Sequence, residues 1–167
     1  MSEQFHDYKF KVKELSKTDS LLEYHKIKVC CRKYDNNEAC IYSNNGGGDY
    51  SLYLQDRFFN FTIDNETKRV SAFDGDIVCS QLKPVKLQLP TTVKDVILSV
   101  DTQDNLEKGC GGYIKFNTSK IFYDKKNKIL QIGDINPKDI TYKFFDNGYT
   151  QIKNDSLSGL MFTEMDM

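Results

Sequence analysis

The feature that most constrains the fold is an apolar side chain at every second position, repeated along the chain in short runs. In residues 8–15 (YKFKVKEL), Tyr8, Phe10 and Val12 alternate with three lysines. Successive side chains of a β-strand point to opposite faces, so this spacing predicts a strand with one buried face and one solvated face.

Similar runs recur, with turn residues between them about every 8 to 12 positions. We predict further strands within 25–34, 39–43, 50–54, 57–75, 85–89, 94–100, 112–116, 120–133, 140–153 and 159–165. Asn, Asp and Gly supply the hairpin turns at 64–68, 125–127 and 146–148. The pattern predicts an all-β or mainly β protein, either an antiparallel sandwich or a curved, barrel-like sheet.

A short helix competes with strand only in residues 16–26 (SKTDSLLEYHK), where Ser20 is a candidate cap. The strands do not alternate with helices, which argues against a parallel sheet. No fixed-period repeat and no linker divides the chain, so we predict that residues 1–167 form a single globular β-rich domain.

The composition excludes several classes of protein. Charged residues make up 28% of the chain and hydrophobic residues 39%, which is unlike a disordered or a membrane protein. The N-terminal residues lack the apolar core of a secretory signal, so we expect a cytoplasmic protein. Its five cysteines, an odd number, are then expected to be free thiols.

Two glycine-rich stretches raise the question of a phosphate site. They are SNNGGGDYSLYL at 43–54 and KGCGGYIKF at 108–116. A phosphate cradle needs a helix N-terminus directly after the glycines, whereas a strand-like run follows each stretch here. We therefore predict that both stretches only connect strands.

The sequence offers little catalytic or metal-binding chemistry. Only His6 and His25 are available as imidazole bases, and no G-x-S-x-G nucleophile motif occurs. The adjacent Cys30 and Cys31 point to opposite faces of a strand, which is unsuited to holding one zinc ion. We predict no catalytic residue, no metal and no cofactor. The enzyme alternative is His25 acting with a carboxylate.

Negative charge gathers in the middle of the chain. Residues 34–112 carry 7 basic and 12 acidic side chains. This excess indicates a partner with positive charge, although a merely solvated surface remains the alternative. The candidate contact residues are Asp49, Asp56, Asp74, Asp76, Asp101, Asp104 and Glu107.

The aromatic content is also high, with eleven Phe and ten Tyr. We expect most of these rings in the core. Candidates for partial surface exposure, where tyrosine often serves recognition, are Tyr50, Tyr53, Tyr113, Tyr142 and Tyr149.

Two stretches resemble parts of known bacterial proteins. NFTIDNETKRVSAFDGDI at 60–77 resembles a hairpin of many small immunity proteins, in which a strand with a Phe-x-Gly ending follows an Asp-containing turn. YTQIKNDSLSGLMF at 149–162 is similar to the C-terminal hairpin of several of them. Together the two stretches cover about a fifth of the chain. Such proteins accompany secreted polymorphic toxins and contact-dependent growth inhibition systems.

The resemblance implies a protein that binds the C-terminal domain of a cognate toxin, often a nuclease. It would block the active site or the substrate path of that domain, without contacting nucleic acid or membrane itself. The alternative function is a small-ligand carrier whose curved sheet encloses a cavity lined by Phe and Tyr. An exposed edge strand could also pair two copies of the chain as a homodimer.

Overall fold

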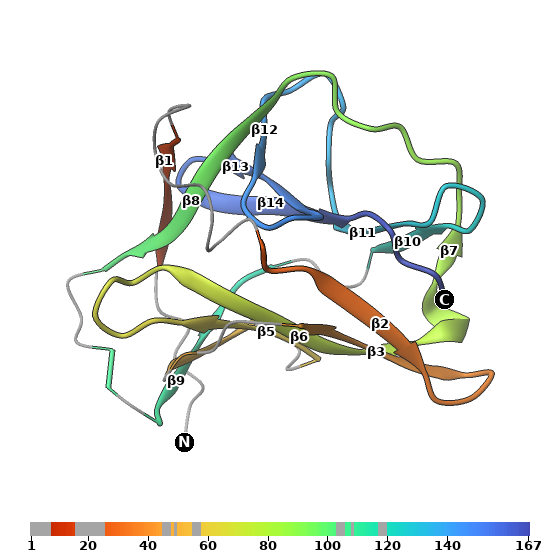
Figure 1. Ribbon diagram of the computed structural model, residues 1–167, viewed down its shortest axis with the longest axis horizontal. Helices are drawn as coiled ribbons and strands as arrows, with labels where there is room; N and C mark the ends of the chain where they lie inside the picture. The colour runs from red at the N-terminus through yellow and green to blue at the C-terminus, as the bar shows by residue number, and fades with distance from the viewer. Residues whose placement is uncertain are drawn as a thin grey trace.

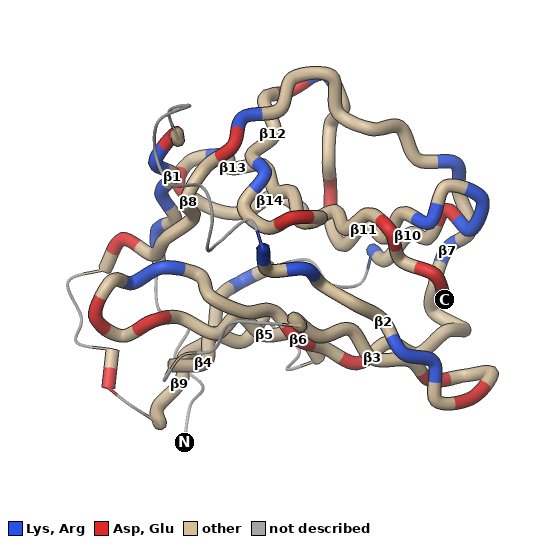
Figure 2. Tube along the Cα trace, in the orientation of Figure 1, with Lys and Arg blue, Asp and Glu red and all other residues tan. Residues whose placement is uncertain are grey.

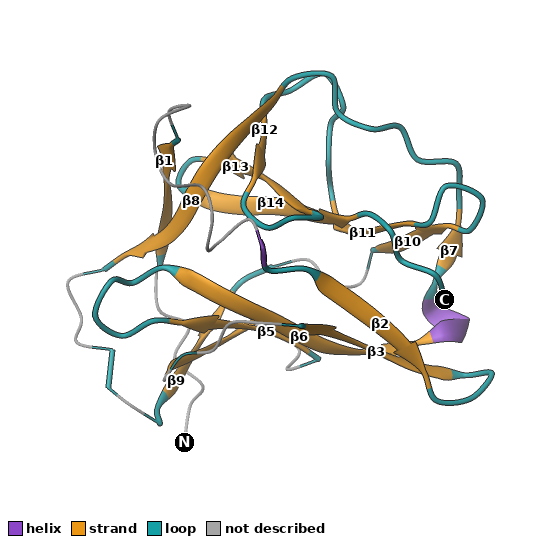
Figure 3. Ribbon diagram, viewed as in Figure 1, coloured by secondary structure: helices purple, strands orange, loops and turns teal. Residues whose placement is uncertain are grey.

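The computed structural model describes residues 8–15, 26–44, 48, 50–54, 58–102, 106–107, 109–116 and 120–167. Within these residues the chain is mainly β-strand, with no α-helix and a 3-10 turn at Cys79–Gln81 (Figure 3). None of the described helical segments has the length and apolar composition needed to cross a membrane. The predicted mainly β class is confirmed. The helix candidate at 16–26 lies outside the described residues, except for its last position.

The strands form two sheets that face each other (Figure 1). The eight-stranded sheet runs in the order β1 (Lys9–Glu14), β8 (Val93–Asp101), β12 (Thr141–Lys143), β13 (Gly148–Lys153), β14 (Ser156–Phe162), β11 (Ile129–Gly133), β10 (Ile121–Asp124) and β7 (Lys83–Pro84). The six-stranded sheet runs in the order β2 (Val29–Lys33), β3 (Glu38–Ser43), β6 (Val70–Val78), β5 (Phe59–Ile63), β4 (Tyr50–Leu54) and β9 (Gly111–Ile114). Neither sheet closes on itself, so the fold is a sandwich and not a barrel.

Most strand pairings are antiparallel, as the hairpin signals predict, but both sheets are mixed. Three described pairings are parallel: β7 with β10, β8 with β12, and β4 with β9. The members of each parallel pair are far apart in sequence, so no hairpin fixes their relative direction.

Phenylalanine rings fill the space between the sheets. Phe73 of β6 stacks on Phe162 of β14, with ring centroids 5.0 Å apart. Phe61 of β5 contacts Phe10 of β1 at 6.2 Å and Phe144, after β12, at 6.3 Å. These contacts join the inward faces of both sheets into one core, which is what the alternation of apolar residues along each strand provides.

The predicted strand at 85–89 is absent. Only Lys83 and Pro84 pair with β10, and the chain then runs on without a ladder. Val85 donates its N–H to the Tyr123 carbonyl (3.3 Å), whereas Leu87 donates to the Asp124 carboxylate (2.9 Å). A side chain takes the place of a neighbouring strand here, which sequence alternation alone does not reveal.

The glycine-rich stretches lie between strands. In the first, the glycines come after β3, which ends at Ser43, and before β4, which begins at Tyr50. The second leads directly into β9 at Gly111. Each stretch is followed by a strand and not by a helix, so neither has the architecture of a phosphate cradle.

Asn147, in the turn between β12 and β13, ties the two sheets together. Its side chain is fully buried, and its Oδ1 accepts the N–H of Val29 in β2 at 2.8 Å. Its Nδ2 donates to the carbonyl oxygens of Val29 (2.8 Å) and Thr163 (2.7 Å). The amide thus occupies the outer edge of β2 at Val29 as a strand neighbour would, and closes that point to strand addition.

Candidate functional site

The outer face of the six-stranded sheet carries a row of polar and aromatic side chains. Cross-strand register places Tyr42 of β3 opposite Asp74 of β6, and Asp74 opposite Asn60 of β5. The row continues through Tyr53 of β4 to Tyr113 of β9, whose rings stack at 5.4 Å. These residues alternate along their strands with buried core residues, so the row faces away from the sandwich core.

A second row beside it adds a carboxylate and an exposed ring. Arg32 lies opposite Cys40, and Cys40 lies opposite Asp76. Asp76 donates its backbone N–H to the carbonyl of Phe58 at 3.0 Å, which brings Phe58 to the end of this row. Tyr42, Asp74 and Asn60 of the first row line a shallow depression of about 550 Å³ together with the second row.

Three large aromatic side chains at this depression are exposed to solvent. Tyr34 is 62% exposed, Phe58 52% and Tyr42 40%. Aromatic rings are enriched where proteins bind one another, because each supplies a large contact area at a small cost in conformational entropy. Rings gathered around a depression are the kind of surface from which a binding site is built.

Gly75 determines how the chain is arranged under this face. A Cβ at position 75 would lie 2.2 Å from Cδ1 of Phe59 and 2.8 Å from the carbonyl oxygen of Phe58. The absent side chain therefore leaves room for the Phe59 ring, which stacks on Phe73 at 6.0 Å. With Phe59 fixed inward, the adjacent Phe58 lies outside, beside Asp76.

The two aspartates differ in environment. Asp74 is half-buried, and burial raises the pKa of its carboxyl group, partly offset by a hydrogen bond from the Ser43 backbone. Asp76 is exposed. The guanidinium of Arg32 lies 6.0 Å from the Tyr34 ring centroid, at the margin of the depression. The face thus combines aromatic rings with a half-buried and an exposed carboxylate.

The structure brings together only part of the predicted acidic set. Asp74 and Asp76 share the outer face described above. Asp101 lies instead at the end of β8 in the other sheet, 3.9 Å from Lys11. Glu107 lies in the connection before β9, where its carboxylate is 3.8 Å from the thiol of Cys110. The remaining candidates, Asp49, Asp56 and Asp104, lie outside the described residues.

The structure describes the candidate cysteines but not the candidate histidines. His6 and His25 lie outside the described residues. No group of three or more His, Cys, Asp or Glu side chains within the described residues could hold a metal ion. All five cysteines are free thiols, as predicted. Cys31 donates its thiol to the carbonyl of Asp166 (3.3 Å), whereas Cys30 lies opposite Tyr42 in the outer row.

Tyr34, Tyr42 and Phe58 are not among the surface residues that the sequence predicts. For Phe58 the sequence carries a signal, because Phe58 directly precedes Phe59 and successive side chains of an extended chain point to opposite sides. Of the tyrosines proposed for the surface, Tyr53 and Tyr113 are half-buried in the outer row. Tyr50 is buried and bonds to Tyr8 inside the sandwich.

The chain matches no protein-family model, no curated protein and no solved structure.

Proposed function

We propose that this protein is a bacterial immunity protein, which binds a cognate toxin domain through the outer face of its six-stranded sheet. The observation that carries the proposal is the clustering of exposed rings and carboxylates in one depression. Tyr34, Tyr42 and Phe58 lie there beside Asp74 and Asp76. The toxin class comes from the resemblance of the two hairpins to immunity proteins.

A face that carries carboxylates complements a basic cleft on the partner. A nuclease domain presents cationic side chains to the phosphates of its substrate, and a surface with carboxylates can occupy that position instead. The exposed rings would supply the apolar contact area that holds the complex, while the charges would increase the association rate. We place this action in the cytoplasm, where the toxin-producing cell must protect its own nucleic acid.

The small-ligand carrier alternative requires free space inside the fold. Between the described parts of the two sheets, the rings of Phe61, Phe73 and Phe162 occupy the position where such a cavity would lie. This packing favours recognition at the outer surface over enclosure of a ligand.

The experiment that tests the proposal uses the gene immediately upstream. If that gene encodes a large exported protein, its C-terminal domain is expressed alone and together with this chain. We expect toxicity when the domain is alone, rescue when both are present, and a 1:1 complex of nanomolar affinity by titration calorimetry. A harmless domain that does not bind this chain would contradict the immunity function.

A further inference from the structure

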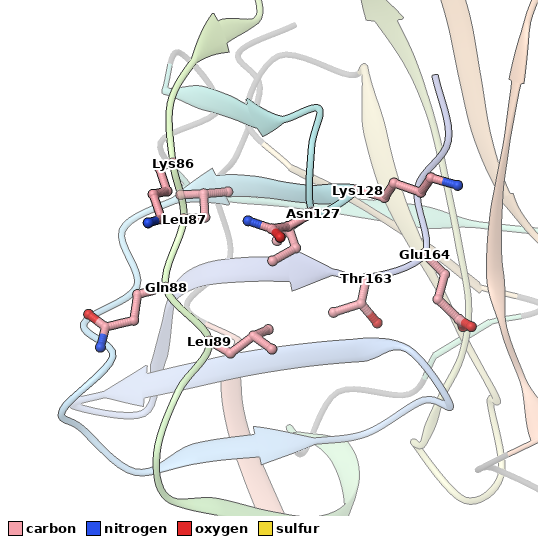
Figure 4. Close-up of a pocket in the computed structure, with 9 residues that line it drawn as sticks. Lys86, Leu87, Gln88, Leu89, Asn127, Lys128, Thr163 and Glu164 are labelled. Atoms are coloured by element: carbon pink, nitrogen blue, oxygen red, sulfur yellow. The ribbon is translucent and has the colours of Figure 1, made fainter.

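A second depression, of about 900 Å³, lies between the segment 85–89 and the residues around the start of β11 and the end of β14 (Figure 4). Leu87 and Leu89 point from the segment toward Asn127 and Thr163, and Gln88 lies on the opposite side (Figure 4). The same depression is lined by Ile129, so its walls combine three aliphatic side chains with polar and charged ones. We refer to it as the 85–89 groove.

The wall of this groove is fixed before any partner arrives. The N–H groups of Val85 and Leu87 are bonded to β10, and Thr91 donates its N–H to the Pro137 carbonyl at 3.1 Å. Asp124, which accepts the Leu87 N–H, is itself buried and accepts two hydrogen bonds from Asn127, at 2.9 and 3.0 Å. A preformed wall loses little conformational entropy when a partner binds.

Apolar surface and backbone groups of the wall remain open. Leu89 is 52% exposed, although it lies in a concave part of the surface. Between the anchored amides, the backbone N–H groups of Lys86 and Gln88 make no hydrogen bond within the described part of the chain. Side chains along the segment alternate as in a strand, but no neighbouring strand pairs with the Lys86 and Gln88 N–H groups. A strand added by a partner needs such unpaired backbone groups.

Lysine side chains surround the groove. Lys86 and Lys128 line it, and the adjoining turn between β10 and β11 adds Lys125 and Lys126, where positive charge gathers in Figure 2. Lys128 is only 3.7 Å from Asp166, in an exposed ion pair of the kind that contributes little. Among the described residues, Lys86, Lys125 and Lys126 form no ion pair. Glu164 also lines the groove, but its carboxylate pairs with Lys28 at 3.0 Å, so the lysines still favour an acidic partner.

We propose that the 85–89 groove binds an extended acidic segment of a partner protein. An apolar side chain of that segment packs against Leu87 and Leu89, while its carboxylates lie near Lys86 and the lysines of the adjoining turn. This site does not rest on the proposed toxin-binding face, which carries carboxylates instead of lysines.

The test uses the isotope-labelled full chain and three synthetic peptides at low ionic strength. The probe is acetyl-Asp-Leu-Glu-Leu-Asp-amide. Its controls are the neutral acetyl-Asn-Leu-Gln-Leu-Asn-amide and the apolar-free acetyl-Asp-Ser-Glu-Ser-Asp-amide. We expect the acidic probe, and neither control peptide, to change chemical shifts at millimolar concentration. These changes should be confined to the amides of 86–89, 127–129 and 163–164.

Two exposed substitutions then test the contacts. Lys86→Glu and Leu89→Asp should each weaken binding of the acidic probe by about tenfold, because one removes a favourable charge and the other the apolar contact. The matched controls Lys138→Glu and Ile140→Asp, which are exposed outside the groove, should leave it unchanged. Absence of shifts at millimolar probe, shifts located on β3 and β6, or equal binding of the neutral peptide would overturn the proposal.

Discussion

Replacement of Asn147 by alanine is the sharpest test of how the sandwich is held together. The substitution removes three hydrogen bonds and leaves the N–H and the carbonyl of Val29 without partners. Val29 is fully buried, so its two backbone groups lie away from bulk solvent. An unpaired buried polar group costs about 1–3 kcal/mol, and two such groups predict a loss of about 3 kcal/mol.

Thermal and urea unfolding followed by circular dichroism would measure this loss. For a chain of 167 residues, each kcal/mol lowers the Tm by about 2–4 °C, so we expect a decrease of roughly 6–12 °C. The matched control is Asn44→Ala, because Asn44 also accepts a backbone N–H, that of Lys28 at 2.9 Å, but in an exposed position. Its loss should stay within about 0.5 kcal/mol.

A third variant separates the hydrogen bonds from side-chain shape. Asn147→Asp keeps the size of the side chain but directs a carboxylate oxygen at two carbonyl oxygens. Burial and these carbonyls should raise the pKa of the new carboxyl group above its unfolded value of about 4. Folding then favours the protonated form. The loss in free energy of unfolding relative to wild type should therefore be smaller below the unfolded-state pKa and should grow as pH rises. If Asn147→Ala costs no more than Asn44→Ala, the bridging role is refuted.

Three further predictions concern the sheet faces. Gly75→Ala should lower the free energy of unfolding by about 1–3 kcal/mol in urea titrations, since its Cβ would lie 2.2 Å from the Phe59 ring; an unchanged midpoint would contradict that packing. Hydrogen bonds from Asn127 and Leu87 lower the pKa of Asp124, so its stabilisation is present above the ordinary Asp pKa and lost as pH falls through the folded value. In Asp124→Asn, the free energy of unfolding should therefore decrease less steeply as pH falls. An equally steep decrease would count against the hydrogen bonds of the Asp124 carboxylate. Tyr42→Ser and Phe58→Ser should each lower the unfolding free energy by no more than about 1 kcal/mol, because about half of each ring is exposed; a larger loss would show that they serve the fold.

Local structure in this chain could be predicted from the sequence. The hairpin of β5 and β6 was predicted because its two strands alternate in polarity and flank an Asp-containing turn. The carboxylate of Asp64 accepts the N–H groups of Glu66 and Thr67 in that turn, at 3.0 and 2.8 Å. These interactions involve neighbours in the chain, which a sequence displays directly.

Contacts between segments that are distant in sequence could not be predicted. The turn at Asp146–Gly148 was predicted, but the bridging role of Asn147 depends on Val29, which is 118 residues away. The segment 85–89 has the alternation of a strand, yet whether a ladder forms depends on the turn after β10. Likewise, only the register of β3, β6 and β5 brings Tyr42, Asp74 and Asn60 into one row.

The proposed toxin-binding surface is the outer face of the six-stranded sheet. The most direct measurement is titration of the C-terminal domain encoded upstream against wild type and against a triple variant, Tyr42→Ser, Phe58→Ser and Asp76→Lys. Lys138→Glu, outside that face, is the control. We predict nanomolar binding by wild type and control, and at least about a hundredfold weaker binding by the triple variant with a slower association rate. Equal affinity of all three proteins would contradict the assignment of this face, and no binding by wild type would contradict the function itself.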